Sequence, residues 1–90
     1  EMEAVESLMT EIARDGPVTY GLAEVSAAAS AGAVETLLVL DSKVREQDLD
    51  SVVRDVESQR GKILVISSQH DAGRRLSALG GIGAILRYNS

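Results

Sequence analysis

Hydrophobic positions recur at helical spacing in the first part of the chain. Val5, Leu8, Met9 and Ile12 lie at i, i+3, i+4 and i+7, which places them on one side of a helix. Most of the neighbouring glutamates fall off this stripe. We expect this helix to end near Asp15-Gly16-Pro17, because glycine and proline both favour a turn. The pattern predicts a surface helix with one buried face.

Three further segments follow the same period. After a short extended piece, 18–20, the alanine-rich segment 21–31 predicts a second helix that ends at Gly32, where a left-handed residue is favourable. A third helix is predicted to begin at the cap residue Asp48 and to end at Gly61. A fourth spans 71–78 and closes at Gly80-Gly81. The side chains expected to face inward from these three helices are Leu22, Val25, Ala29, Leu49, Val52, Val53, Val56, Ala72, Leu76 and Leu79.

Two short continuous apolar runs separate these helices. The segments 36–40 and 63–66 read as strands covered on both faces, the first of them central in a sheet. A helix between two such strands implies a right-handed parallel crossover. A last strand is predicted from Ile82 to about Tyr88. The sequence therefore predicts one α/β domain over residues 1–90, arranged as a three-layer α/β/α sandwich.

Composition removes several classes of function. The chain has no cysteine and one histidine, His70, so we expect neither a disulfide framework nor a structural zinc site. The net charge of −5 and the presence of two tyrosines as the only aromatic residues disfavour nucleic acid as a default partner. No apolar run approaches the roughly 18–20 residues that span a bilayer. We expect a soluble intracellular domain, and its start at Glu1 inside a helix indicates a piece of something longer.

Two groups of residues resemble catalytic motifs without matching them. Ser67, Ser68, His70 and Asp71 are the residue types of a hydrolytic triad, but they are too close along one backbone to converge as a triad does. The glycines of 80–83 follow a helix and enter a strand, the reverse of a phosphate-binding loop. We expect no catalytic residue, no metal ligand and no cofactor in this domain.

Binding to another protein is the remaining function that the residues themselves allow. Arg74 and Arg75 lie on the outward side of the fourth predicted helix, either as a solvated face or as a contact for an acidic partner. Arg87 and Tyr88 end an apolar strand, and arginine and tyrosine are enriched at binding hot spots. The alternative for this pair is an edge strand that finishes in solvent, and composition does not decide between the two.

Four segments between Val18 and Tyr88 form an ordered set of sequence blocks. They are Val18-Thr19-Tyr20-Gly21-Leu22, Gly32-Ala33-Val34-Glu35-Thr36-Leu37-Leu38-Val39, Ser67-Ser68-Gln69-His70-Asp71-Ala72-Gly73 and Leu79-Gly80-Gly81-Ile82-Gly83-Ala84-Ile85-Leu86-Arg87-Tyr88. In this order they resemble the C-terminal domain shared by Pelota and the class-I peptide chain release factors, and the match extends over nearly the whole chain. Within this family, the serine pair followed by His70, Asp71 and Gly73 is more similar to the Pelota branch, and the glycine pair and Tyr88 are more similar to archaeal members.

The resemblance implies the C-terminal domain of a three-domain cytoplasmic translation factor that acts in ribosome rescue and mRNA surveillance. The implied partners are a translational GTPase of the elongation factor 1 alpha type, an ABC-type ribosome-recycling ATPase, and the ribosome through the full-length protein. A metal-dependent endonuclease activity attributed to the family belongs to its N-terminal domain. The predicted partner-binding residues are Arg74, Arg75, Ala84, Ile85, Leu86, Arg87 and Tyr88, although the family usually has glycine in place of Ala84.

The resemblance also implies the fold of the kink-turn RNA-binding proteins, with a mixed sheet of about four strands. Those proteins carry Gly-x-Asn-Glu-x-x-Lys at the start of their second helix, and here the frame reads Gly21-Leu22-Ala23-Glu24-Val25-Ser26-Ala27. Alanine replaces both the base-reading asparagine and the phosphate-directed lysine, so we do not expect kink-turn binding. The alternatives left open are the same domain from an archaeal release factor and, less favoured, an RNA-binding module.

Overall fold

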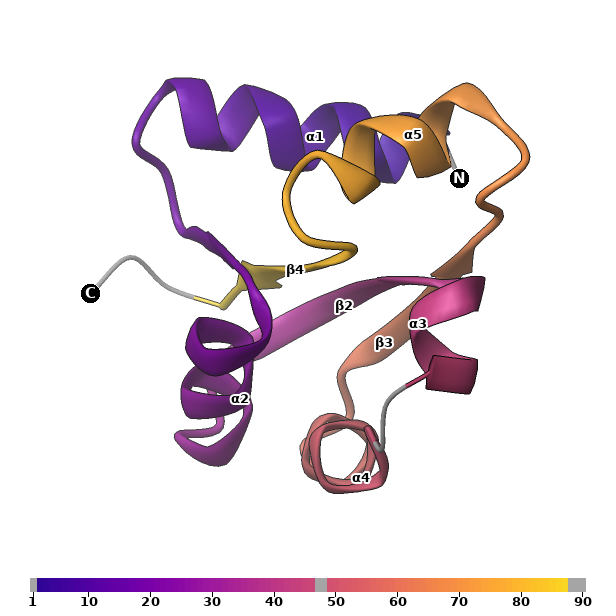
Figure 1. Ribbon diagram of the computed structural model, residues 1–90. Helices are drawn as coiled ribbons and strands as arrows, with labels where there is room; N and C mark the ends of the chain where they lie inside the picture. The colour runs from indigo at the N-terminus through magenta and orange to yellow at the C-terminus, as the bar shows by residue number, and fades with distance from the viewer. Residues whose placement is uncertain (1, 47–48, 88–90) are drawn as a thin grey trace.

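The chain folds into a mixed β-sheet between two layers of helices (Figure 1). The computed structural model describes residues 2–46 and 49–87. In chain order the elements are α1 (Met2–Ala13), β1 (Val18–Tyr20), α2 (Leu22–Ser30), β2 (Val34–Leu40), α3 (Asp41–Glu46), α4 (Asp50–Ser58), β3 (Lys62–Ile66), α5 (Asp71–Ser77) and β4 (Ile82–Leu86). The predicted three-layer α/β/α arrangement is confirmed.

The strands lie in the order β1-β4-β2-β3. β2 pairs with β3 in parallel, from Thr36 beside Lys62 to Leu40 beside Ile66, and α4 lies in the connection between them. β4 is antiparallel to both β1 and β2. The predicted parallel pair and the mixed sheet are therefore both present, with β4 and β2 as the two inner strands.

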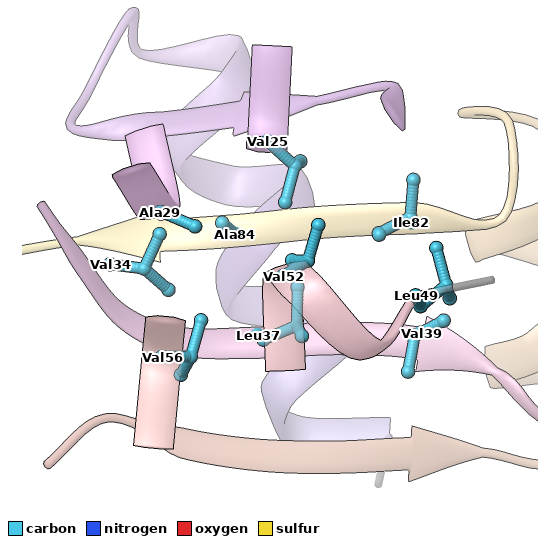
Figure 2. Close-up of a cluster of buried hydrophobic side chains, with 10 residues drawn as sticks. All are labelled: Val25, Ala29, Val34, Leu37, Val39, Leu49, Val52, Val56, Ile82 and Ala84. Carbon is cyan, nitrogen blue, oxygen red and sulfur yellow. The ribbon is translucent and has the colours of Figure 1, made fainter. Parts of the chain in front are cut away.

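Each face of the sheet has its own hydrophobic core. α2 and α4 cover one face and α1 and α5 the other (Figure 1). The first core combines residues of β2, β4, α2 and α4, with Leu49 at the start of α4 (Figure 2): Val25, Ala29, Val34, Leu37, Val39, Leu49, Val52, Val56, Ile82 and Ala84. The second contains Val5, Leu8, Leu38, Leu40, Ile66, Ala72 and Leu76. From Leu37 to Leu40 the side chains of β2 alternate between the two cores, because successive residues of a strand point to opposite faces. A register shift between Val34 and Thr36 places Val34 in the first core as well.

α5 ends just before the glycine pair Gly80-Gly81, as predicted. Gly80 and Gly81 have φ angles of 96° and 83°, in the left-handed region that glycine enters without a Cβ clash. Their N–H groups donate to the carbonyls of Ser77 and Leu76, each at 3.0 Å, and so satisfy the last turn of the helix. The glycine pair therefore turns the chain from α5 into β4, which confirms the prediction that these glycines close a helix and lead into a strand.

Two local expectations were wrong, and one helix was not predicted. β3 is an edge strand, and Val65 is 51% exposed, although its apolar run predicted cover on both faces. Leu22 is 38% exposed at the first residue of α2 instead of facing inward. α3 was not predicted, because its single large hydrophobic residue, Val44, is exposed and gives no apolar stripe. The predicted cap residue Asp48 lies outside the described residues.

In the two described stretches of the chain, no helix has both the length and the apolar character needed to cross a bilayer.

Candidate partner-docking surfaces

The two arginines of α5 are both exposed to solvent. Arg74 forms an ion pair with Asp71, one turn earlier on the same helix, at 3.3 Å from Nη1 to Oδ1. Arg75 has no carboxylate partner within the described residues. A solvent-exposed pair at this spacing contributes little to stability. Both guanidinium groups therefore remain accessible to a partner, Arg75 the more so.

β4 is an inner strand, so it is not the solvent-exposed edge that was the alternative interpretation of this segment. Ala84 has no exposed surface and belongs to the core beneath α2 and α4, so direct contact of its side chain with a partner, one of our expectations, is excluded in this conformation. Ile85 and Leu86 are partly buried and pack against the two cores from opposite faces. The apolar part of the segment therefore serves mainly the sheet.

Arg87 follows β4 and is exposed. Its backbone N–H donates to the carbonyl of Ala33 at 2.8 Å, and its guanidinium donates to the carbonyl of Gln59 just after α4. The Gln59 side chain in turn donates from Nε2 to the carbonyl of Ala29, at the end of α2, at 2.8 Å. Arg87 is thereby held beside the ends of α2 and α4. Tyr88, which was predicted to contribute here, lies outside the described residues.

The predicted basic residues do not form one patch. α5 packs against α1 on one face of the sheet, whereas the guanidinium of Arg87 binds next to α4 on the other face. α5 precedes β4 in the chain (Figure 1), and Arg87 follows Leu86, the last residue of β4. The chain therefore presents two separate basic positions, at opposite ends of one inner strand.

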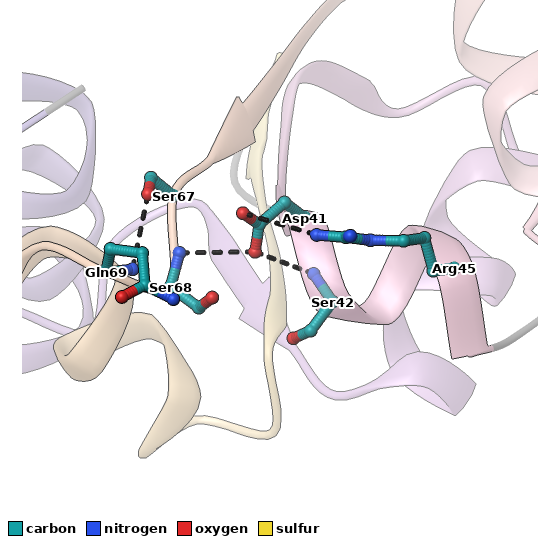
Figure 3. A network of polar contacts seen from close by, with 6 residues as sticks. All are labelled: Asp41, Ser42, Arg45, Ser67, Ser68 and Gln69. Atoms are coloured by element: carbon teal, nitrogen blue, oxygen red, sulfur yellow. Dashed lines mark hydrogen bonds and ion pairs between the residues drawn. The ribbon is translucent and has the colours of Figure 1, made fainter.

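The serine-rich segment before α5 is occupied by structural contacts (Figure 3). The Ser67 hydroxyl accepts a hydrogen bond from the Gln69 N–H at 3.2 Å. Asp41 Oδ1 accepts from the backbone N–H groups of Ser42 at 2.7 Å and Ser68 at 3.2 Å, and Arg45 lies 3.8 Å from Oδ2. Hydrogen bonding by Ser68, then by the Ser42 N–H, and the charge of Arg45 hold the pKa of Asp41 below its usual value against some opposing desolvation.

His70 is exposed at the position that precedes α5, and its side chain makes no capping hydrogen bond there. Within the described residues, no group of three or more histidine, aspartate or glutamate side chains is arranged to hold a metal ion. The serine segment forms a turn that Asp41, directly after β2, holds in place through the Ser68 N–H. These residues therefore have structural contacts and do not form the arrangement of a hydrolytic triad.

One surface feature was missed by sequence reasoning. A groove of about 450 Å³ lies between β1, α2 and the end of β4. Its lining residues are Val18, Thr19, Glu24, Ala27, Ala28, Ala31, Ala33 and Leu86. The alanine-rich segment 21–31 was used only to predict a helix, and two of its alanines, Ala27 and Ala31, are exposed and leave the groove open. Their repeat at i, i+4 on the outer side of the helix was the available signal.

The fold and sequence place the chain in a known class of domain. A sequence profile described as eRF1 domain 3 matches residues 1–90, and the chain belongs to this family. It is similar to the protein pelota homolog of Methanothrix thermoacetophila, with 46% identity over 88 residues, which cover 98% of this chain and 25% of that protein. The chain thus spans about a quarter of the length of such relatives.

Two solved structures share the fold. S. cerevisiae Dom34, a translation termination-like factor involved in RNA quality control pathways and interacting with Hbs1, matches with a TM-score of 0.88 and 30% identity, over 98% of this chain and 27% of Dom34. Archaeal Pelota, in a structure of ribosome-bound Pelota and ABCE1, matches with a TM-score of 0.85 and 42% identity, over 98% of this chain and 26% of the compared chain. The predicted family and the similarity to its Pelota branch are confirmed.

Proposed function

We propose that this chain is the protein-docking C-terminal domain of a cytoplasmic ribosome-rescue factor of the Pelota type. The observation that carries the proposal is the similarity over 98% of the chain to a Pelota that is ribosome-bound in a structure with ABCE1. Dom34, which interacts with Hbs1, shares the same fold. The second support is that Arg75 and Arg87 are exposed, because arginine is enriched at binding hot spots.

The partners that we propose are a translational GTPase of the elongation factor 1 alpha type and an ABC-type ribosome-recycling ATPase. Arg75 and Arg87 lie on different faces of the domain, so two partners can be recognised at two positions without competing for one patch. Arginine suits both positions, because its planar guanidinium binds carboxylates in a bidentate manner. The domain then acts by positioning proteins relative to one another.

Charge reversal in the full-length protein tests this function. We expect Arg75→Glu and Arg87→Glu each to weaken binding of at least one partner about tenfold, measured by calorimetry with the purified GTPase and ATPase. Arg54→Glu, at an exposed position of α4, is the matched control and should leave both affinities unchanged. Unchanged binding of both partners in Arg74→Glu, Arg75→Glu and Arg87→Glu would contradict the proposed docking residues, and no binding by the unmodified protein would contradict the function.

A further inference from the structure

β1 is the second edge of the sheet, opposite β3. The Leu86 N–H donates to the Pro17 carbonyl at 2.8 Å, and the Gly21 N–H donates to the Ile82 carbonyl at 3.0 Å. In an antiparallel pair, alternate residues of a strand direct both backbone groups toward the partner strand. The backbone groups of every second residue from Pro17 therefore face β4, and the backbone groups of the residues between them face away from the sheet.

The outward-facing residues of β1 are Val18 and Tyr20. The Val18 N–H is occupied by the carbonyl of Gly16 at 2.8 Å, so its carbonyl and both backbone groups of Tyr20 are directed to the open edge. These groups have the spacing with which an added strand exchanges hydrogen bonds. Tyr20 is also 46% exposed, so this end of the edge is in contact with solvent.

The groove between β1 and α2 begins beside this edge, where Val18 and Thr19 line it, and extends over the α2 side of the sheet to Ala33 and Leu86. Alanine methyl groups form its helical wall, and they leave space for the side chains of a strand laid beside β1. Among the described residues of the lining, Glu24, in the first turn of α2 and near the Tyr20 end, is the only charged one. Leu86 and Ala33 line the opposite end, near Val18. A strand edge beside a helix, with a groove between them, is the geometry that binds extended peptides by strand addition.

We propose that the β1–α2 groove binds an extended segment of a partner protein, which adds as a fifth strand beside β1. Its side chains toward α2 are small and apolar, and a lysine or arginine faces Glu24. Charge complementarity supports a cationic segment, because the groove lining carries one negative charge and the chain has a net charge of −5. This inference rests on the proposed docking function and assigns it a further surface, which lies away from Arg75 and adjoins Arg87 at the end that Ala33 and Leu86 line.

Variants at exposed positions of α2 test the groove without altering the core. In the full-length protein, Ala27→Gln extends into the groove and should weaken binding of the GTPase or the ATPase about tenfold, whereas Ala23→Gln, on the same helix but outside the lining, should not. Glu24→Gln should weaken binding of the same partner about threefold, and Glu57→Gln on α4 is its control. Thermal unfolding verifies that each variant is folded.

Hydrogen exchange gives a direct measurement of strand addition. The Tyr20 amide should exchange at least tenfold more slowly in the complex with that partner, because its N–H is then bonded, while the Thr19 amide, which already faces β4, should change less. An unchanged affinity of Ala27→Gln for both partners, or an unchanged exchange rate of the Tyr20 amide in the complex, would overturn peptide binding in the groove and leave the docking function intact. Binding of neither partner by the unmodified protein overturns both.

Discussion

Gly73 lies directly against the carbonyl oxygen of Ser67: a Cβ built on this glycine would be 2.0 Å from that oxygen. No side chain fits at such a distance, and the opposing atom is backbone that cannot rotate away. The contact seats the first turn of α5 on the turn that leaves β3. Gly73 is needed for this close approach, and its position in a helix would otherwise favour alanine.

We therefore expect Gly73→Ala to lower the free energy of unfolding by about 3 kcal/mol, as overpacking against rigid neighbours does. Urea unfolding followed by circular dichroism measures the change. Ser77→Ala, at an exposed position of the same helix, should change it by less than about 0.5 kcal/mol. A Gly73→Ala protein as stable as the parent would show that the turn at Ser67 moves freely.

Asp41 links the end of β2 to the turn before α5, and its charge should contribute to stability. Because hydrogen bonding by Ser68 lowers its pKa in the folded state, the contribution is complete above the pKa of the unfolded chain, about 3.9, and is lost as the pH falls through the folded value. Asp41→Asn should thus be less stable than the parent at pH 7. The difference should shrink as the pH is lowered below about 4, which unfolding curves from pH 7 to pH 2.5 measure.

Asn keeps an oxygen acceptor at position 41, so this comparison isolates the charge. Asp55→Asn makes the same substitution on α4, outside the contacts of Asp41, and serves as the control for the substitution itself. A stability difference for Asp41→Asn that stays constant across the titration would exclude the proposed role of the carboxylate.

Gln59 joins α2 to α4 through its hydrogen bond to the Ala29 carbonyl. We expect Gln59→Glu to lower stability by about 2 kcal/mol at neutral pH, because a carboxylate cannot donate to that carbonyl. Gln59→Met keeps the shape, loses the same bond and also removes Oε1, which is buried without a partner in the described structure, so its cost should be smaller, about 1 kcal/mol. Chemical denaturation of the two variants measures both costs, and a parent-like stability of both variants would argue against this hydrogen bond.

The inner and edge strands should respond differently to the loss of side-chain volume. Leu38 is fully buried on β2, and Leu38→Ala should cost roughly 2–5 kcal/mol through lost contacts and a cavity. Val65 is half exposed on β3, and Val65→Ala should cost less than about 1 kcal/mol. Thermal or urea unfolding measures the loss of stability in both variants. Similar losses for Leu38→Ala and Val65→Ala would mean that β3 is covered in solution.

Kink-turn RNA should not bind specifically. Ala23, Glu24 and Ala27 are exposed on α2, so this surface offers the RNA no asparagine amide or lysine from the motif. In a gel shift at moderate salt we expect nothing tighter than nonspecific binding, with Kd values no lower than about 10⁻⁶ M. A kink-turn RNA bound in preference to a mutated control RNA would restore the RNA-binding interpretation.

The sequence predicted the elements that have a clear period or a glycine end. The stripe of α1 and the glycine pair after α5 placed those helices within a few residues. α3 was missed because one turn and a half with a single exposed valine has no amphipathic pattern. β3 was predicted to be buried on both faces because an inner strand and an edge strand can have the same apolar run. Only the order of the strands in the sheet distinguishes the two cases.

The docking surfaces depended on contacts between distant segments. Arg75 was correctly placed on an exposed helix face by local spacing alone. Nothing local indicated that Arg87 reaches the carbonyl of Gln59, or that Ala84 is fully buried, because both follow from β4 lying between β1 and β2. The groove depends on the same strand order, since β1 offers an open edge only when no strand follows it in the sheet.

The position of β4 has a consequence for how the domain comes into being during translation. β4 is the last strand of the sheet along the chain, yet it lies between β1 and β2. Until Ile82–Leu86 has left the ribosome exit tunnel, β1 has no neighbour and β2 has only β3. The sheet can therefore close only after synthesis has passed Arg87, and a nascent chain that stops earlier exposes the two strands that β4 would join.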